Sequence, residues 1–235
     1  MSGIPDAKRG LAARPLRLYA VEIAMIGMVA ALLIRYVDLP LALRLSGVQA
    51  GTAELGALLK AIHYLGRGEY YLAVALPALL LGGWLVRHGS WVMQGWPLLR
   101  AGALATGTLA LGHLLVFLLK QGFARLRPSE LARGGGYGFA DPFSGEPFTS
   151  LPSSHAFTAF AMAAVFSRLQ PELRAVFFGA ALLVAVQRML THHHFLSDIF
   201  VSLFLALMVS EVMHAAWYRI EPILAMRLPC RIQSG

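Results

Sequence analysis

The sequence predicts an all-α membrane protein, a bundle of six transmembrane helices with one further helix lying in the membrane interface. Its composition points to this class, because 57% of the 235 residues are hydrophobic and only 14% are charged. A soluble domain carries about 25% charged residues and roughly 45–50% apolar ones. The chain also contains apolar segments of spanning length, since a helix crosses a ~30 Å hydrocarbon core in about 20 residues.

The same composition excludes other classes of protein. Disorder requires low hydrophobicity and a high charge density, and a disulfide scaffold requires paired cysteines, whereas Cys230 is the single cysteine. The formal net charge of +8 raises nucleic-acid binding, but basic residues on an apolar chain are more often anchors beside the membrane. We therefore predict no nucleic-acid partner, and no obligate protein partner is evident.

The spans follow from the apolar segments, which lie in one predicted domain, residues 1–235, with tails at 1–17 and 218–235. No small-residue cleavage site follows the first span, so it is expected to be retained. The predicted spans are Leu18–Leu33, Tyr71–Val86, Leu98–Leu119, the short Phe157–Leu169, Ala175–Leu190 and Leu196–Trp217.

The segment Ala53–Leu65 predicts a helix in the interface. Its apolar residues recur at steps of three and four, while Glu54, Lys60 and His63 interrupt them, as in a helix that turns a polar face to the headgroups. Aromatic anchors at headgroup level fall near the predicted span ends: Tyr70, Tyr71, Trp84, Trp91, Trp96 and Trp217.

The Lys and Arg residues favour cytoplasmic termini. With the N-terminus inside, eleven of them lie in cytoplasmic segments and nine on the other side. The outer number falls to six if Lys120, Arg127 and Arg188 are kept there by function. This predicts a bacterial-type inner-membrane protein with a site that faces the periplasm.

Three polar clusters lie on that outer side. Lys120 and Arg127 are seven residues apart at the end of a span, so both would point to one face, about 10 Å apart, if the helix continued to Pro128. Ser153 and Ser154 precede the next span, where serines cap a helix and free N–H groups form an anion site.

The third cluster lies before the last span and includes Arg188. His194 and Asp198 are four residues apart, so on a helix the carboxylate can reach the imidazole and fix its tautomer. Fixed cations and helix N–H groups neutralise phosphate oxygens. A His–Asp pair makes a nucleophile, and a second histidine, His155, can protonate a departing oxygen. This set of groups suits a phosphoryl group and needs no metal or other cofactor.

These clusters resemble the signature of the type 2 phosphatidic acid phosphatase superfamily, which comprises integral membrane lipid phosphatases. The signature K-x6-R-P, P-S-G-H and S-R-x5-H-x3-D corresponds here to K-QGFARL-RP at Lys120–Pro128, PSSH at Pro152–His155, and QR-MLTHH-H-FLS-D at Gln187–Asp198. Order and spacing match. Two positions depart from it: Ser154 replaces the usual glycine, and Gln187 replaces serine.

The resemblance implies a role for each matching residue. His194 would attack phosphorus and form a phosphohistidine, Asp198 would orient it, and His155 would act as general acid and then activate water. Lys120, Arg127, Ser153 and Arg188 would hold the phosphate, together with the backbone N–H of Ser154. The substrate would be a lipid phosphate such as lipid A, a polyprenyl pyrophosphate or a glycerophospholipid, and the motifs do not choose among them.

Alternatives remain at this level. A transferase would pass the phosphate to another acceptor, and a binder or transporter would hold an anionic headgroup without cleaving it. The run from His192 to His194 suggests a metal, but adjacent helical side chains point about 100° apart. His192 and His193 are therefore expected at the rim. Residues left outside the predicted site are His113, Glu22 and Glu211.

Overall fold

The computed structural model describes residues 16–46, 53–88 and 92–227. Most of the predicted tail 1–17, the last part of the tail 218–235 and Trp91 lie outside these ranges. Apart from one isolated bridge between Arg125 and Phe139, the described residues contain no β-structure. The helices are α1 (Leu16–Tyr36), α2 (Asp38–Ser46), α3 (Ala53–Leu65), α4 (Gly68–Arg87), α5 (Val92–Phe123), α6 (Ser154–Leu169), α7 (Arg174–Leu190) and α8 (Leu196–Arg227), with short 3-10 helices at Pro128–Arg133 and Pro171–Leu173.

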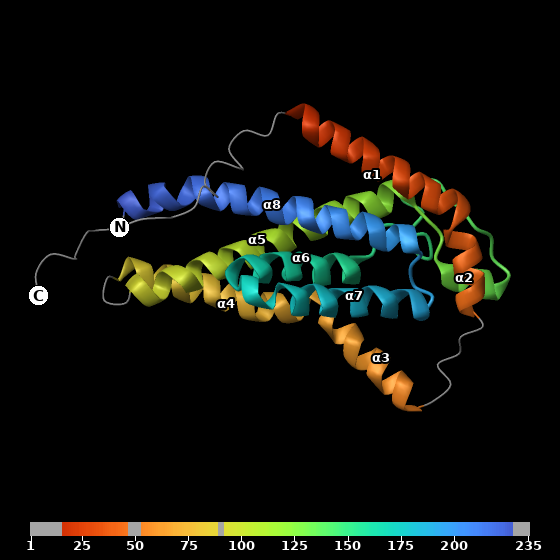
Figure 1. Cartoon of the computed structure of the whole chain (residues 1–235), viewed down its shortest axis with the longest axis horizontal. Coiled ribbons are helices and arrows are strands. Elements are labelled where there is room, and N and C mark those ends of the chain that lie inside the picture. The colour runs from red at the N-terminus through yellow and green to blue at the C-terminus, as the bar shows by residue number, and fades with distance from the viewer. Residues whose placement is uncertain (1–15, 47–52, 89–91, 228–235) are drawn as a thin grey trace, which may run out of the picture.

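Helices α4 to α8 run side by side along the long axis of the molecule (Figure 1), with α6 packed against α5, α7 and α8. The helix α1 contacts α8, while α3 diverges from the bundle. The end of α5, the start of α6, the end of α7 and the start of α8 meet at one end of the bundle. This arrangement brings the three polar clusters together, although they are far apart in the sequence.

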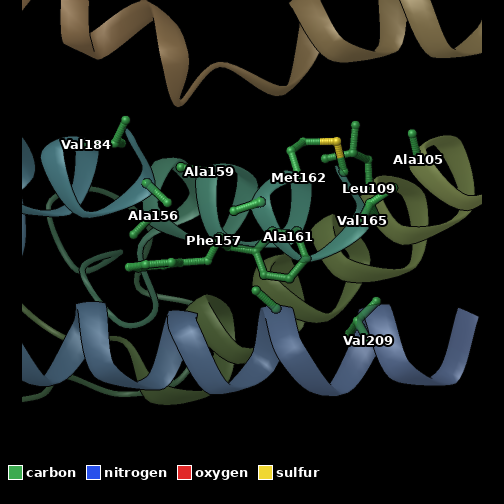
Figure 2. Close-up of a cluster of buried hydrophobic side chains, with 14 of the residues drawn as sticks. Ala105, Leu109, Ala156, Phe157, Ala159, Ala161, Met162, Val165, Val184 and Val209 are labelled. Atoms are coloured by element: carbon green, nitrogen blue, oxygen red, sulfur yellow. The ribbon is translucent and has the colours of Figure 1, made fainter. Parts of the chain in front are cut away.

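The centre of the core is α6. Eleven of its 16 residues are buried, and five of these are alanine, whose small side chain lets the neighbouring helices approach closely. Figure 2 shows Phe157 in this core beside Ala161 and Met162. On α5, a Cβ at Gly112 would lie 1.8 Å from Cζ of Phe157, so only glycine accommodates the ring. The core therefore fixes the direction of α6 and the position of its first turn.

Five candidate spans meet the requirements of length and hydropathy within the described residues: Tyr19–Tyr36, Glu54–Arg87, Gln94–Phe123, Pro171–Leu190 and Leu196–Met226. The predicted span Phe157–Leu169 corresponds to α6, whose 16 residues are shorter than the ~20 that a crossing needs. The segment predicted to lie in the interface forms the helix α3, which falls within the candidate span Glu54–Arg87, so its interfacial location stays a prediction. The all-helical prediction is confirmed, whereas the six-span count is not.

The helix α5 does not continue to Arg127, although the spacing of the two cations is compatible with a helix to that point. It ends at Phe123, and Ala124 adopts a positive φ of 44°. The chain then turns back on itself, because the Leu126 N–H donates to the Gly138 carbonyl. Arg127 is extended, the conformation favoured before a proline. A folded loop rather than a helix face therefore places Arg127.

Candidate active site

The start of α6 is fixed to α8 by serines. The Ser153 side chain caps α6 and accepts a hydrogen bond from the Ala156 N–H at 3.4 Å. Its own N–H donates to Ser202 Oγ at 2.8 Å, and that hydroxyl donates to the Asp198 carbonyl at 2.6 Å. Ser153 is fully buried. The N–H of Ser154 lies in the first turn of α6, where an anion is favoured.

The predicted nucleophile, His194, lies in the short connection between α7 and α8 and is only 4% exposed. Its Nδ1 lies 2.8 Å from the carbonyl oxygen of Ser150. A carbonyl only accepts, so Nδ1 carries the proton and Nε2 keeps its lone pair. Burial lowers the pKa of His194 to about 3, against the opposing effect of Asp198. The imidazole is therefore neutral at physiological pH, as a nucleophile must be.

Asp198 is fully buried in the first turn of α8 and does not bond directly to His194. Its Oδ2 lies 3.7 Å from Nδ1 of His194, beyond hydrogen-bond distance. The carboxylate instead accepts hydrogen bonds from Arg125 Nη1 at 2.7 Å, Ser150 Oγ at 2.6 Å and the Phe195 N–H at 2.8 Å. The predicted contact is replaced by an indirect connection through Ser150.

The three predicted cations come from separate elements, and two of them bond to the loop before α6. Lys120, in the last turn of α5, donates to the carbonyl of Thr149. Arg127 donates to Oγ1 of Thr149 at 3.0 Å and to Glu146 at 2.7 Å. Arg188, in the last turn of α7, is 5% exposed and donates from Nη1 to Nδ1 of His63 at 3.1 Å. The loop before α6 therefore holds Lys120 and Arg127 close to Ser150, the residue whose carbonyl bonds to His194.

The predicted acid, His155, faces this cluster from α6. Its ring lies 4.4 Å from that of His63, centroid to centroid, at 33°. The buried Nε2 of His155 has no hydrogen-bond partner among the described residues, so it is available to a ligand. Burial, then the positive charge of Arg188, lowers the pKa of His155 to about 3. A bound phosphate would offset that charge and raise this pKa.

A polar pocket of about 360 Å³ adjoins His155. It is lined by His63, Gly66, Arg67, Gly68, Glu69, His113, Ser154 and His155. The α3–α4 corner forms one wall, where a Cβ at Gly66 would lie 2.9 Å from Cβ of His155. His63, near the end of α3, brings that helix into the lining of the pocket.

Four residues of this region were not predicted: Asp38, His63, Arg125 and Ser150. In the sequence, His63 is one of the polar residues that interrupt the amphipathic segment Ala53–Leu65. Arg125 stands inside the first motif, between its two named cations, so its basic charge was the available signal. Asp38 and Ser150 lie outside all three motifs, and no local pattern connects them with His194 or Asp198.

The residues left outside the site have local partners. His113 Nε2 lies 3.0 Å from Oγ1 of Thr158, and Glu211 pairs with Arg168. The His193 ring bonds to Thr191 within its own turn. Across the residues that the structure describes, no group of three or more His, Cys, Asp or Glu is arranged to hold a metal ion.

Stability is expected to fall as the pH drops below about 6.5, the ordinary pKa of histidine. In the folded chain, burial lowers the pKa to about 3 for His155 and His194, and to about 4 for His193. Between these values and 6.5 the unfolded chain binds more protons, so the free energy of unfolding decreases with falling pH. Thermal unfolding in detergent at pH 7.5 and 5.0 measures this. An equal Tm at both values would contradict it, and His155→Gln should lose part of the dependence.

The chain is similar to a known family and to two known proteins. The family model described as "PAP2 superfamily" matches residues 101–221, just over half of the chain. A lipid A 1-phosphatase of Rhizobium johnstonii is 36% identical over 103 residues, and one of Rhizobium etli is 35% identical over the same length. Each match covers 43% of this chain and only 42% or 44% of the relative, less than half of its length.

The fold also has a solved counterpart. The crystal structure of Aquifex aeolicus LpxE superposes with a TM-score of 0.52 at 21% identity, over 76% of this chain and 94% of that one. The family match contains all three motifs, from Lys120 to Asp198. On this evidence, the chain belongs to the PAP2 superfamily.

Proposed function

We propose that this protein is a membrane phosphatase that hydrolyses a phosphate monoester or pyrophosphate of a lipid through a phosphohistidine, without a metal. The observation that carries the proposal is the state of His194, which is buried and neutral with Nδ1 bonded to a carbonyl. Its Nε2 lone pair is therefore free to attack phosphorus. A protein that only binds or transports an anionic headgroup needs no such nucleophile.

The reaction has two steps. The bound phosphate raises the pKa of His155, so that His155 carries a proton. The Nε2 of His194 attacks phosphorus, and the bond to the leaving oxygen breaks as protonated His155 donates its proton to that oxygen. Lys120, Arg127 and Arg188 would neutralise the equatorial oxygens, where charge is spread in the transition state. His155 then takes a proton from water, which attacks the phosphohistidine and releases inorganic phosphate, leaving both histidines as they began.

A lipid leaving group fits the space beside His155. Next to the polar pocket, an apolar cavity of about 630 Å³ lies between α4, α5 and α6. Small residues leave it open, among them Ala78, Ala101 and Ala105. Met162 and Phe166 line it at seven and eleven residues beyond His155 on α6, about 10 and 16 Å farther along the helix. An acyl chain extending into the membrane from the phosphate end would run in this direction.

The substrate proposed first is a lipid A 1-phosphate, because the similar Rhizobium proteins carry that name. We further propose a sixth crossing at Phe157–Leu169 within α6, cytoplasmic termini, and an active site that opens to the periplasm from the inner membrane. The excess of Lys and Arg in the cytoplasmic segments supports this orientation.

The proposal is tested by phosphate release from purified protein. Lipid A, undecaprenyl pyrophosphate, phosphatidylglycerol phosphate and phosphatidic acid are offered in detergent, with and without EDTA. Release from at least one lipid that persists in EDTA is expected. Loss of activity that a divalent ion restores would contradict the metal-free mechanism, and transfer of labelled phosphate to an added acceptor would favour a transferase.

Filling the apolar cavity should reduce activity only on long-chain substrates. Ala78→Leu places three extra carbons in the cavity, whereas Ala73→Leu puts them on the exposed face of the same helix. We expect kcat/KM for a long-chain lipid to fall about tenfold in Ala78→Leu, since overpacking costs about 1–3 kcal/mol. Ala73→Leu should have the kcat/KM of the wild type for the long-chain lipid. The wild type and both variants should hydrolyse p-nitrophenyl phosphate equally fast. Equal losses on both substrates would contradict this role for the cavity.

A further inference from the structure

A buried ionic cluster lies behind the active site. Arg125 has no exposed surface and bridges two carboxylates, donating from Nη1 to Asp198 at 2.7 Å and from Nη2 to Asp38 at 2.8 Å. These three residues come from the loop after α5 and the first turns of α8 and α2. The Phe195 ring stacks on the guanidinium at 4.3 Å. Burying a charge costs several kcal/mol of desolvation free energy, which the attraction between paired charges largely only offsets. A gain in folding stability alone is therefore a poor explanation for this cluster.

Asp38 attaches α2 to the start of α8. Its Oδ1 accepts the backbone N–H of Ser197 at 3.0 Å, and its Oδ2 accepts the Ser197 hydroxyl. Ser197 Oγ also accepts from Arg125 Nη1 at 2.6 Å. A carboxylate is favourable at a helix N-terminus, where free N–H groups need acceptors. Asp38 and Arg125 together therefore fix the turn of α8 that carries Asp198.

Ser150 connects this cluster to the nucleophile, and all three of its polar groups are used. Its N–H donates to the Arg125 carbonyl at 2.9 Å, its hydroxyl donates to Asp198 Oδ2 at 2.6 Å, and its carbonyl accepts from His194 Nδ1 at 2.8 Å. Ser150 has no exposed surface. The carbonyl that bonds to His194 is thus held in one orientation from both sides.

We infer, on the basis of the proposed function, that Ser150 is a positioning residue for His194, and that Arg125 and Asp38 fix the carboxylate that holds Ser150. Asp198 acts on His194 through the Ser150 peptide group rather than by direct contact. The carbonyl keeps the proton on Nδ1, so Nε2 faces phosphorus. When the ring gains positive charge on attack, the carbonyl and the nearby carboxylate stabilise it.

The first test compares Ser150→Ala with Ser150→Thr, which retains the hydroxyl. Loss of a hydrogen bond to a charged group should lower kcat by about 10- to 100-fold in the alanine variant. KM should stay within about twofold, because the phosphate-binding cations are untouched. Ser150→Thr should recover most of kcat. The matched control is Ser167→Ala, a buried serine on α6 that lies twelve residues from His155, about 18 Å along the helix.

The second test uses a readout that does not depend on turnover. In protein labelled with 15N-histidine, with His194→Gln as the reference for assignment, the His194 signal should report the Nδ1–H tautomer. In Ser150→Ala and in Arg125→Lys, which keeps the charge but loses the planar fork, the Nε2–H form should increase. Unfolding in detergent checks that each variant is folded.

The outcomes separate the inference from the proposed function. If the wild type hydrolyses lipid phosphate but Ser150→Ala keeps both its kcat and the wild-type tautomer, the positioning role is wrong. If the wild type hydrolyses none of the offered lipids, the proposed function fails, and the tautomer spectra still decide the role of Ser150. A rise in KM with unchanged kcat would also overturn it, because that would place Ser150 in phosphate binding.

Discussion

Replacing His194 with alanine should reduce phosphate release by at least about 10⁴-fold, the scale on which removal of a nucleophile acts in other enzymes. The remaining cations could still bind the phosphate, but no other nucleophile occupies the place of Nε2. The variant should therefore bind inorganic phosphate with nearly unchanged affinity. Phosphate release and equilibrium binding of 32P-labelled inorganic phosphate measure the two effects separately.

Trapping of the intermediate sharpens this prediction. Rapid quenching with a 32P-labelled lipid phosphate should leave acid-labile label on the wild-type protein and none on His194→Ala. The matched control is His193→Ala, since His193 bonds only within its own turn, and it should retain the label. Full activity in His194→Ala would falsify the covalent mechanism.

The sequence contains enough information to predict the local parts of the site. His194, Asp198 and Arg188 lie within one stretch of eleven residues, so the sequence predicts that they lie close together. The direct contact expected on a shared helix is not formed, because His194 precedes α8, which begins at Leu196. Ser153 begins a helix as the serine pair suggests. Such features depend on helical periodicity and capping, which act over a few residues.

The parts that could not be predicted depend on contacts between distant segments. Arg125 and Asp38 are 87 residues apart, and the position of Ser150 beside His194 requires the loop before α6 to fold back over the end of the bundle. In the sequence, Asp38 is simply a polar residue after the first span. At Arg127 both kinds of cause act: Pro128 favours an extended residue before it, whereas the pairing of Leu126 with Gly138 depends on the folded loop.

The fold shows the same division. Long apolar segments predicted α1, α4, α5, α7 and α8, because length and hydropathy are properties of one segment. The helix α6 is different, since its burial comes from packing between α5, α7 and α8 rather than from its own length. Whether it counts as a crossing therefore depends on the depth of the bundle in the bilayer, which no local pattern encodes.

Replacing His155 with glutamine should lower hydrolysis of a lipid phosphate by about 10²- to 10⁴-fold, the usual contribution of general acid–base catalysis. In this variant, formation of the phosphohistidine should depend on the leaving group of the substrate, whereas its hydrolysis should not. The p-nitrophenolate ion leaves without a proton, so attack by His194 on p-nitrophenyl phosphate should be nearly unaffected. Dephosphorylation should remain slow, because water still needs a base, and phosphohistidine should accumulate after a burst of p-nitrophenol.

A matched control is His214→Gln, because His214 is buried on α8 and lies eighteen residues beyond Leu196, the start of that helix, about 27 Å along it. It reports the general cost of burying glutamine and should show neither the burst nor the accumulation. If His155→Gln instead lost activity equally on both substrates without trapped phosphohistidine, His155 would not activate water. The unpartnered Nε2 of His155 would then serve only to bind phosphate, and another group would have to supply the proton.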